Sequence, residues 1–322
     1  MDHYDKALEW IHNNTVGDDE GIIVASNKRV IYPEVTGYYI PSLLHAGETD
    51  LARKFAKKMC NIQKSDGSWY DSDDQYPFIF DTGQILKGLV AIRKIMPEVD
   101  EHIVKGIDWI FSNMDDEGHL IQPNREVWGP DDTHCNDLIH IYAMSPILEA
   151  AKFLNRPDYA KNANRALDYY INNYRDRIVN YTLFSHFYAY VIEGLIDCGR
   201  IELAKEAMKN FDKFRRPDGA VCAYNDVDWT CSTATFQFSI IWYKLGEKEK
   251  GDRSFEYMSN LQNLSGGWYG SYGYNKLEGY VNKALVKFRL AKRAQYGRWT
   301  EISWANKFFL DAAYYKSLAE QK

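Results

Sequence analysis

The chain of 322 residues is poor in the features that mark disulfide scaffolds, metal clips and membrane spans. Its five cysteines form no CxxC pair, and an odd number without metal-ligand spacing is typical of reduced thiols in a cytoplasmic protein. No run of about 18 apolar residues occurs, so we expect no membrane span. The N-terminal MDHYDKALEW is charged and lacks the apolar stretch of a signal peptide. These absences predict a cytoplasmic location.

An excess of positive charge is also lacking. The 39 Lys and Arg residues are outnumbered by 45 Asp and Glu, which gives a formal net charge of −6. Because nucleic-acid affinity rests on neutralising phosphates, we expect no nucleic-acid partner. Aromatic residues, in contrast, are abundant, with 24 Tyr and 9 Trp. Flat rings with polar tips suit the faces of sugars as well as ordinary packing.

A repeat of paired helices runs through the chain. In each pair an amphipathic stretch rich in apolar and aromatic residues is followed by one that carries charge on one face, as expected of an inner and an outer helix. The predicted inner helices are residues 36–47, 80–95, 132–154, 185–199, 232–246 and 301–318. The predicted outer helices are residues 49–63, 99–114, 156–174, 201–214, 248–262 and 2–14.

The unpaired first and last helices suggest that the repeat closes on itself. Helix 2–14 has no partner before it and helix 301–318 has none after it, so the two complete a sixth pair. We therefore predict an all-α fold, an (α/α)6 toroid formed by a single domain of residues 1–322, in which the N-terminal helix closes the ring against the C-terminal one. An open helical solenoid is the alternative.

The predicted topology places all long loops at one end of the ring, which we call the rim. Each long loop joins the end of an outer helix to the start of an inner one, so the N-termini of the inner helices also lie there. Their dipoles and free N–H groups favour anionic or strongly polar ligands. Asp81, in the stretch FDTGQILKGL, lies at such a start, where it could cap the helix or point into the site.

Some loop sequences resemble motifs of the terpenoid cyclases and prenyltransferases. QKSDGSW (residues 63–69) and QNLSGGW (262–268) resemble their Gln-Trp repeats, and DSDD (71–74) resembles the protonating DxDD motif with Asp73 as the acid. DDTHCND (131–137) contains the residue types of the zinc site of prenyltransferases. However, DSDD is followed by Gln-Tyr-Pro, which indicates a loop rather than an inner helix. We therefore keep an isoprenoid cyclase as an alternative and predict no metal or other cofactor.

The repeat as a whole, over nearly the full chain, resembles the six-hairpin glycosidases, a group that includes unsaturated glucuronyl hydrolases and sugar epimerases. Such chemistry needs two carboxyl groups on opposite sides of a glycosidic bond. Carboxylates near predicted inner-helix starts are Glu34, Asp81, Asp131, Asp132, Asp226, Asp228 and Glu301. We predict acid/base catalysis by Asp81 and Asp132 with His134. The predicted substrate-binding residues are Glu34, Tyr38, Trp69, Gln84, Trp128, His186, Tyr188, Asp228, Trp268, Glu301 and Trp304.

The sequence thus predicts a carbohydrate-active enzyme of the glycoside hydrolase, lyase or epimerase type. The long basic stretch 273–299, unusual in an acidic chain, favours an anionic carbohydrate ligand, such as an acidic or phosphate-bearing glycan or sugar intermediate. Apart from the cyclase, the alternative is a non-catalytic glycan-binding module of a polysaccharide biosynthesis system.

Overall fold

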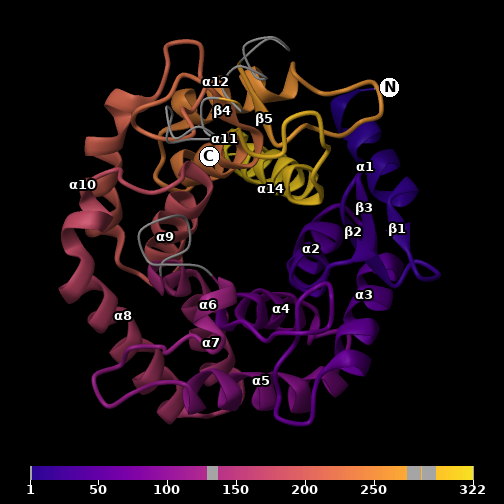
Figure 1. The fold of residues 1–322 in the computed structure, drawn as a ribbon, viewed down its shortest axis with the longest axis vertical. Coiled ribbons are helices and arrows are strands. Elements are labelled where there is room, and N and C mark those ends of the chain that lie inside the picture. The colour runs from indigo at the N-terminus through magenta and orange to yellow at the C-terminus, as the bar shows by residue number, and fades with distance from the viewer. Residues whose placement is uncertain (1, 129–136, 274–283, 285–294, 322) are drawn as a thin grey trace.

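The computed structural model describes residues 2–128, 137–273, 284 and 295–321, and these form a ring of two concentric layers of helices (Figure 1). Within them, the inner layer consists of α2 (Pro33–His45), α4 (Ile79–Ile92), α7 (Ile141–Phe153), α9 (Ser185–Asp197), α11 (Ser232–Lys244) and α14 (Ser303–Glu320). The outer layer consists of α3 (Thr49–Ile62), α5 (Asp100–Ser112), α8 (Pro157–Val179), α10 (Ile201–Phe211), α12 (Lys248–Ser259) and α1 (His3–Asn13). The predicted all-α (α/α)6 toroid is confirmed.

Burial separates the two layers as the sequence pattern predicts. Every residue of α11 from Ser232 to Tyr243 is buried, because this inner helix packs on all its sides. In the outer helix α3 only one stripe is buried, which runs from Leu51 through Phe55 to Met59 at helical spacing. The ring therefore has its apolar core between the layers and its charged residues on the outside.

Glycines in the loops let each hairpin pack directly against the next outer helix. Gly67 follows α3 with a φ of 96°, and a Cβ at this position would overlap the carbonyl oxygen of Lys105 in α5. Gly266 follows α12 with a φ of 92°, and a Cβ there would overlap the carbonyl oxygen of Lys6 in α1. A side chain is excluded at both positions by conformation and by space.

The same loops show that α1 takes the place of the sixth outer helix. The Gln63 side-chain amide donates to the carbonyl of His102 at 3.0 Å, and the Gln262 amide donates to the carbonyl of His3 at 2.9 Å. Since His102 lies in α5 and His3 in α1, α1 follows α12 in the ring as α5 follows α3. The ring is thus closed between the two ends of the chain, as predicted.

Small sheets and short helices decorate the rim, and the sequence analysis did not predict them. β1 (Thr15–Val16), β2 (Gly21–Ala25) and β3 (Lys28–Ile31) form an antiparallel sheet in that order, with Thr15 opposite Ile22 and Ile23 opposite Ile31. β4 (Thr230–Cys231) pairs with β5 (Ser271–Tyr272). The short helices are α6 (Arg125–Trp128) and the 3-10 turns η1 (Pro97–Val99), η2 (Asp137–His140) and η3 (Asp212–Phe214).

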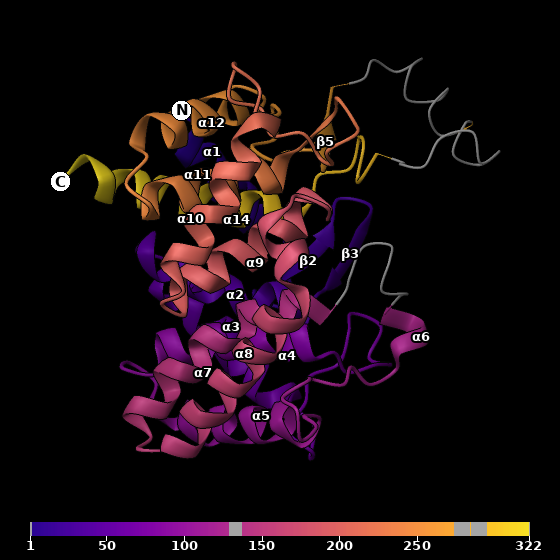
Figure 2. The ribbon, with the colours of Figure 1, turned by 90° about the vertical axis from the view of Figure 1, so that its left-hand side faces the viewer.

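The long loops gather at one end of the ring, as predicted. Seen from the side, α6 and β5 lie at this rim, whereas the C-terminal end of α14 projects from the opposite end (Figure 2). Helix boundaries differ from the predicted ones by a few residues. For example, α2 begins at Pro33 rather than residue 36, because proline is well suited to a first turn. Among the described residues, no helix combines the length and apolarity needed to cross a bilayer.

Candidate active site

Two buried carboxylates, Glu34 and Asp81, lie side by side at the rim, and we call them the rim pair. Glu34 is the second residue of α2 and Asp81 the third of α4. The two helices approach closely at Gly37, where the lack of a side chain leaves room for the backbone of Ile85 and a Cβ would collide with it. Glu34 and Asp81 lie about one turn above these two contact residues, toward the rim. Their carboxyl groups are therefore neighbours, and they are only 5% and 2% exposed.

Asp81 does not cap its helix. The residue before α4 is Phe78, which offers no capping side chain, and the first N–H of the helix, from Ile79, donates instead to the Gln122 side-chain oxygen at 3.0 Å. The Asp81 carboxylate accepts a hydrogen bond from the Tyr32 hydroxyl at 3.3 Å. Of the two roles that the sequence left open for Asp81, the structure thus does not show the helix cap, and the role in the site stays a prediction.

Burial changes the protonation of the rim pair. Burial raises the pKa of Asp81 to about 7, although the Tyr32 hydrogen bond acts in the opposite direction. Burial, followed by the charge of Asp81, raises the pKa of Glu34 well above its ordinary value, against a lowering contribution from Lys307. The two carboxyl groups interact, so the protonation of one depends on the state of the other. Such a pair can donate and accept a proton at physiological pH.

Aromatic side chains flank the rim pair on the side of α14. The Tyr32 ring meets Trp304 edge-on with centroids 6.2 Å apart, and Trp304 meets Tyr296 at 6.3 Å. Tyr296 in turn contacts Phe184, which precedes α9, at 5.4 Å. Trp304, a predicted substrate-binding residue, is half-buried beside the pair. Its neighbours form a wall against which a sugar ring could pack.

His186 stands on α9, across the ring from α2, and is buried and neutral. Its Nδ1 lies 2.7 Å from the side-chain oxygen of Gln237 on α11. Burial lowers the pKa of His186 to about 3, so this imidazole serves hydrogen bonding rather than acid/base chemistry at neutral pH. Gln84, one turn below Asp81, is also buried, and its side-chain oxygen has no hydrogen-bond partner among the described residues. Both residues were predicted to bind substrate, and both face the barrel interior.

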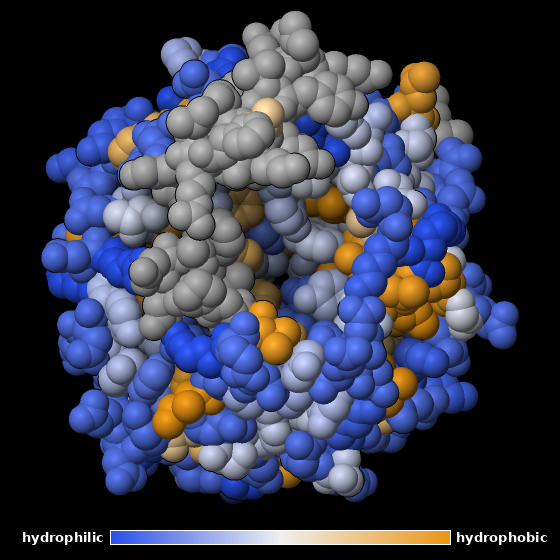
Figure 3. All heavy atoms as spheres, viewed as in Figure 1, coloured by the Kyte–Doolittle hydropathy of each residue, from blue (hydrophilic) through white to orange (hydrophobic). Residues whose placement is uncertain are grey.

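A layer of aromatic side chains closes the barrel beneath these groups. We call it the aromatic floor, and it consists of Tyr38, Phe80, Tyr142, Tyr190 and Phe308, with ring centroids 4.8–6.5 Å apart. Viewed from the rim, the centre of the ring is hollowed above it (Figure 3). The predicted substrate-binding residue Tyr38 belongs to this floor. The rim side of the barrel is therefore a funnel with an aromatic base, and the rim pair lies at its mouth.

Two predicted platforms, Trp69 and Trp268, are wrong as sugar-binding residues, because both rings are fully buried. Trp69 donates its indole N–H to the carbonyl of Met59, and Trp268 donates to that of Met258, each at 2.7 Å. The acceptors lie in α3 and α12, so these tryptophans bind their loops to the outer helices. Tyr188 likewise faces outward, with its hydroxyl bound to the carbonyl of Ile178 at 2.7 Å.

Two predicted carboxylates also lie away from the funnel. Glu301 accepts the Trp10 indole N–H and the Asn263 amide at 2.7 Å each, and the Ser265 hydroxyl as well, so it holds the 263–267 loop to α1. Asp228 is exposed on the loop before β4 and does not cap α11. The types of these residues matched the chemistry, but their partners could not be read from the sequence.

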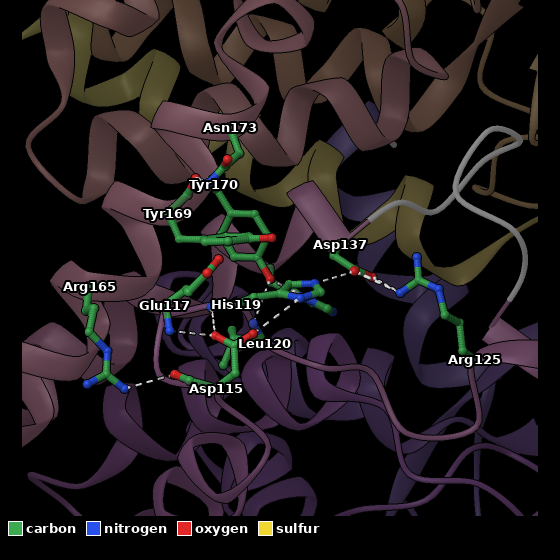
Figure 4. A network of polar contacts seen from close by, with 11 residues as sticks. Asp115, Glu117, His119, Leu120, Arg125, Asp137, Arg165, Tyr169, Tyr170 and Asn173 are labelled. Carbon is green, nitrogen blue, oxygen red and sulfur yellow. Dashed lines mark hydrogen bonds and ion pairs between the residues drawn. The ribbon is translucent and has the colours of Figure 1, made fainter.

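For three further predicted residues, the structure describes only part of one. Asp132 and His134 lie outside the described residues, and of Trp128 only the backbone, at the end of α6, is described. The residue that follows this stretch, Asp137, is bound by His119 at 2.9 Å and by Arg125 at 2.8 Å (Figure 4). Burial raises the pKa of Asp137, but His140, His119 and Arg125 together lower it below its ordinary value. Asp137 therefore clamps the rim loop to the start of the third inner helix.

The sequence analysis identified neither Lys307 nor Tyr32 as a site residue. Lys307 is a buried cation on α14, and the signal for it was a lysine inside the apolar stretch SWANKFFL. The DSDD motif of the cyclase alternative lies on an exposed loop, where Asp73 pairs with Lys28 at 2.9 Å. In the described part of the chain, no three His, Cys, Asp or Glu residues are arranged to hold a metal ion.

The opposite end of the barrel also has a hollow, of about 1260 Å³. Its lining includes Lys87, Asp197 and Tyr315. Lys87 and Asp197 there are paired with opposite charges, Lys87 with Asp197 at 4.0 Å and Asp197 with Lys244 at 2.6 Å. We therefore place the candidate active site at the rim, where buried carboxylates have no such partners in the described residues.

Known structures share this fold along their entire length. An unsaturated glucuronyl hydrolase specific for heparin has 11% sequence identity and a TM-score of 0.74, and the match covers 99% of this chain and 97% of the hydrolase. A possible family GH105 member from Salmonella enterica serovar Paratyphi A has 12% identity and a TM-score of 0.68, over 99% and 94% of the two chains. A family 88 glycosyl hydrolase from Bacteroides vulgatus has 9% identity and a TM-score of 0.68, over 98% and 99%.

The chain thus has the six-hairpin glycosidase fold that the sequence predicted. No protein-family model and no curated protein sequence matches it. At these identities the shared fold does not assign an activity, which has to be argued from the site.

Proposed function

We propose that this chain is a glycoside hydrolase-like enzyme that acts on an acidic or phosphate-bearing glycan or sugar intermediate. The observation that carries the proposal is the rim pair, two adjacent buried carboxyl groups with raised pKa values at the mouth of a funnel. Perturbed carboxyl groups in a concave site are the usual signature of acid/base catalysis. The glycosidases that share the fold support the choice of carbohydrate as substrate.

In this proposal Asp81 exchanges the proton with the substrate. A pKa of about 7 lets it donate a proton to a leaving oxygen and recover that proton from water or from the sugar. Glu34, whose pKa is also raised by burial and by its neighbour, is the second carboxyl group of the pair and lies where it can hydrogen-bond to the substrate. Asp132 remains our prediction for a second carboxylate, with His134 beside it. Elimination and epimerisation need the same proton exchange, so they stay within the proposal.

Three features support an anionic substrate. Raised pKa values reduce the negative charge of the rim pair, and the Lys307 ammonium lies about one turn beneath Glu34, over the Tyr38 ring. Within the described ranges, the six inner helices also begin without a side-chain capping hydrogen bond, so their dipoles act on the funnel. The residues at these starts are Tyr32, Phe78, His140, Phe184, Cys231 and Ile302.

The first test is a substrate panel read by mass spectrometry. Oligosaccharides containing uronic acids or sulfate, sugar phosphates, nucleotide sugars and neutral oligosaccharides would be incubated with the wild type and with Asp81→Asn, Glu34→Gln and Asp73→Asn. We expect turnover of an anionic member, and losses of about 10²–10⁴-fold in Asp81→Asn. We expect a large loss in Glu34→Gln as well. Asp73→Asn, an exposed carboxylate on the neighbouring loop, should stay within about twofold of the wild type.

The outcomes separate the alternatives. Water gain indicates hydrolysis, and a product of unchanged mass indicates epimerisation. Full activity in Asp81→Asn would remove the rim pair from the mechanism, and loss in Asp73→Asn alone would favour the cyclase-type acid. If the wild type binds one glycan and converts nothing in the panel, the chain is a binding module.

A further inference from the structure

Lys307 is a buried cation on α14 that lies below the funnel. Its side chain is 1% exposed, and its ammonium lies over the Phe308 ring at 3.8 Å and over the Tyr38 ring at 4.5 Å. One turn further along α14, Asp311 pairs with it at 2.7 Å. The other oxygen of Asp311 accepts the Ser42 hydroxyl at 2.6 Å. The cation is therefore held in place from α2 and α14, the two inner helices at which the ring closes.

The position of this ammonium relative to the rim pair follows from helix geometry. Tyr38, whose ring the ammonium covers, is four residues after Glu34 and therefore lies one turn below it on the same face of α2. On α14, Trp304 is three residues before Lys307 and packs against Tyr32, which binds Asp81. The fixed positive charge thus lies about one turn beneath Glu34, in an apolar layer where charges act strongly.

We propose that Lys307 is a positioning residue whose charge keeps one member of the rim pair ionised at neutral pH. This role rests on the proposed function, because the pair needs one ionised carboxylate to accept a proton. Without the cation, burial and the charge of Asp81 would raise the pKa of Glu34 further, unopposed. The lowering effect of Lys307 on the pKa of Glu34 agrees with this geometry.

Other charged groups also lie near Glu34, so the pKa of Glu34 depends on the sum of their effects and that of Lys307. Asp311 partly cancels the field of Lys307, but it lies one turn further from Glu34. Neutral His186 adds no charge of its own at this pH. The titratable and charged groups that interact with Lys307 are Glu34, Tyr38, Tyr39 and His45 from α2, Lys87 from α4, His186 and Glu193 from α9, and Asp311 from α14.

The test uses two substitutions with opposite expected effects. Lys307→Met removes the positive charge and should raise the titration midpoint of Glu34 by about one pH unit or more. Asp311→Asn removes the cancelling charge and should lower that midpoint. Lys307→Arg keeps the charge and should restore the wild-type value. The midpoints are read by NMR of carboxyl-carbon-labelled protein, and the limb of the activity profile that requires an ionised carboxylate should shift in parallel.

A purely structural ion pair behaves differently. In that case both substitutions lower the melting temperature and neither moves the Glu34 midpoint, which would overturn the proposal. The double variant Lys307→Met/Asp311→Asn leaves no unpaired charge, so it provides a folded protein if the single variant is unstable, and its midpoint should still lie above that of the wild type. Because the NMR readout needs no substrate, this inference can fail while the proposed activity stands, and the reverse also holds.

Discussion

The two ends of the barrel hold buried carboxylates of similar exposure in opposite states. At the rim, Asp81 has its pKa raised to about 7 by burial. Toward the opposite end, Glu193 is equally buried, but the charges of Lys244, Lys87 and Lys307 outweigh burial and lower its pKa to about 2. Lys244 contacts Glu193 at 2.9 Å. Burial alone therefore does not decide the state of a carboxyl group. A cation within contact distance does.

The difference separates a structural from a functional use of buried charge. The lower groups, which we call the ionic layer, form paired contacts between α4, α9, α11 and α14 and consist of Lys87, Glu193, Asp197, Lys244, Lys307 and Asp311. The rim pair lacks an ion-pair partner among the described residues. Asp81 therefore keeps a raised pKa and can exchange a proton near neutral pH. Removing charges at the two ends should accordingly have opposite consequences.

The largest effect on stability is expected from the ionic layer. Lys244→Met leaves Glu193 and Asp197 without their closest cation and should lower the free energy of unfolding by about 3–5 kcal/mol. Urea denaturation measures this loss. The exposed pair of Lys205 with Glu202 provides the control, since Lys205→Met should cost less than about 1 kcal/mol. Equal costs at the two sites would contradict the distinction between buried and exposed pairs.

At the rim, neutralising a carboxylate should stabilise the protein in a pH-dependent way. The folded pKa of Asp81, about 7, lies above the ordinary 3.8, so its contribution to stability is fully present below pH 3.8 and is lost as the pH rises toward 7. The loss amounts to roughly 4 kcal/mol at most. Asp81→Asn should thus exceed the wild type in stability at pH 8 and match it at pH 3.5, as measured by urea denaturation.

The control for this comparison is Asp73→Asn, which should differ from the wild type by less than about 0.5 kcal/mol at both pH values, because its carboxylate is exposed. A uniform loss of stability in Asp81→Asn at both pH values would mean that Asp81 is an ordinary structural aspartate. The same variant is the one expected to lose activity, so stability and activity should change in opposite directions.

The smallest effect should come from Tyr32→Phe. The Tyr32 hydroxyl stabilises the ionised Asp81 at 3.3 Å, so its removal should raise the Asp81 midpoint by about half a pH unit. The pH profile of activity reports this shift. Tyr39→Phe removes a hydrogen bond of 2.6 Å to the Ser303 carbonyl and should leave the profile unchanged. Equal shifts in the two variants would point to a general loss of packing.

The fold could be predicted from the sequence because its signal is repeated. Helical periodicity recurs in every pair, and the two unpaired terminal helices indicated closure, which the matched loops at Gln63 and Gln262 confirm. The strands at residues 15–31 were missed because they are short and form a local addition to the repeat. A pattern that recurs in six helix pairs can be recognised even if one pair is misread. The short strands at residues 15–31 occur once, so no repeat helps to identify them.

The site was harder to predict, since exposure and partners decide function there. Trp69 and Glu301 have residue types that suit a sugar site, yet each makes contacts that hold its loop to an outer helix. Asp81 was found because its place at an inner-helix start follows from the topology. Lys307 was missed because a lysine in an apolar helix was not recognised as a buried charge. Residue type is local information, but the state of a charge depends on helices far apart in the sequence.

The most direct test of the account is a pH titration of the carboxyl carbons by NMR, with Asp81 and Glu193 assigned from the spectra of Asp81→Asn and Glu193→Gln. The account predicts that Asp81 titrates near pH 7 and Glu193 near pH 2 in the same protein. If instead Asp81 titrates close to the ordinary value of 3.8, the rim carboxylates are not prepared for proton transfer at neutral pH, and the proposed active site is wrong.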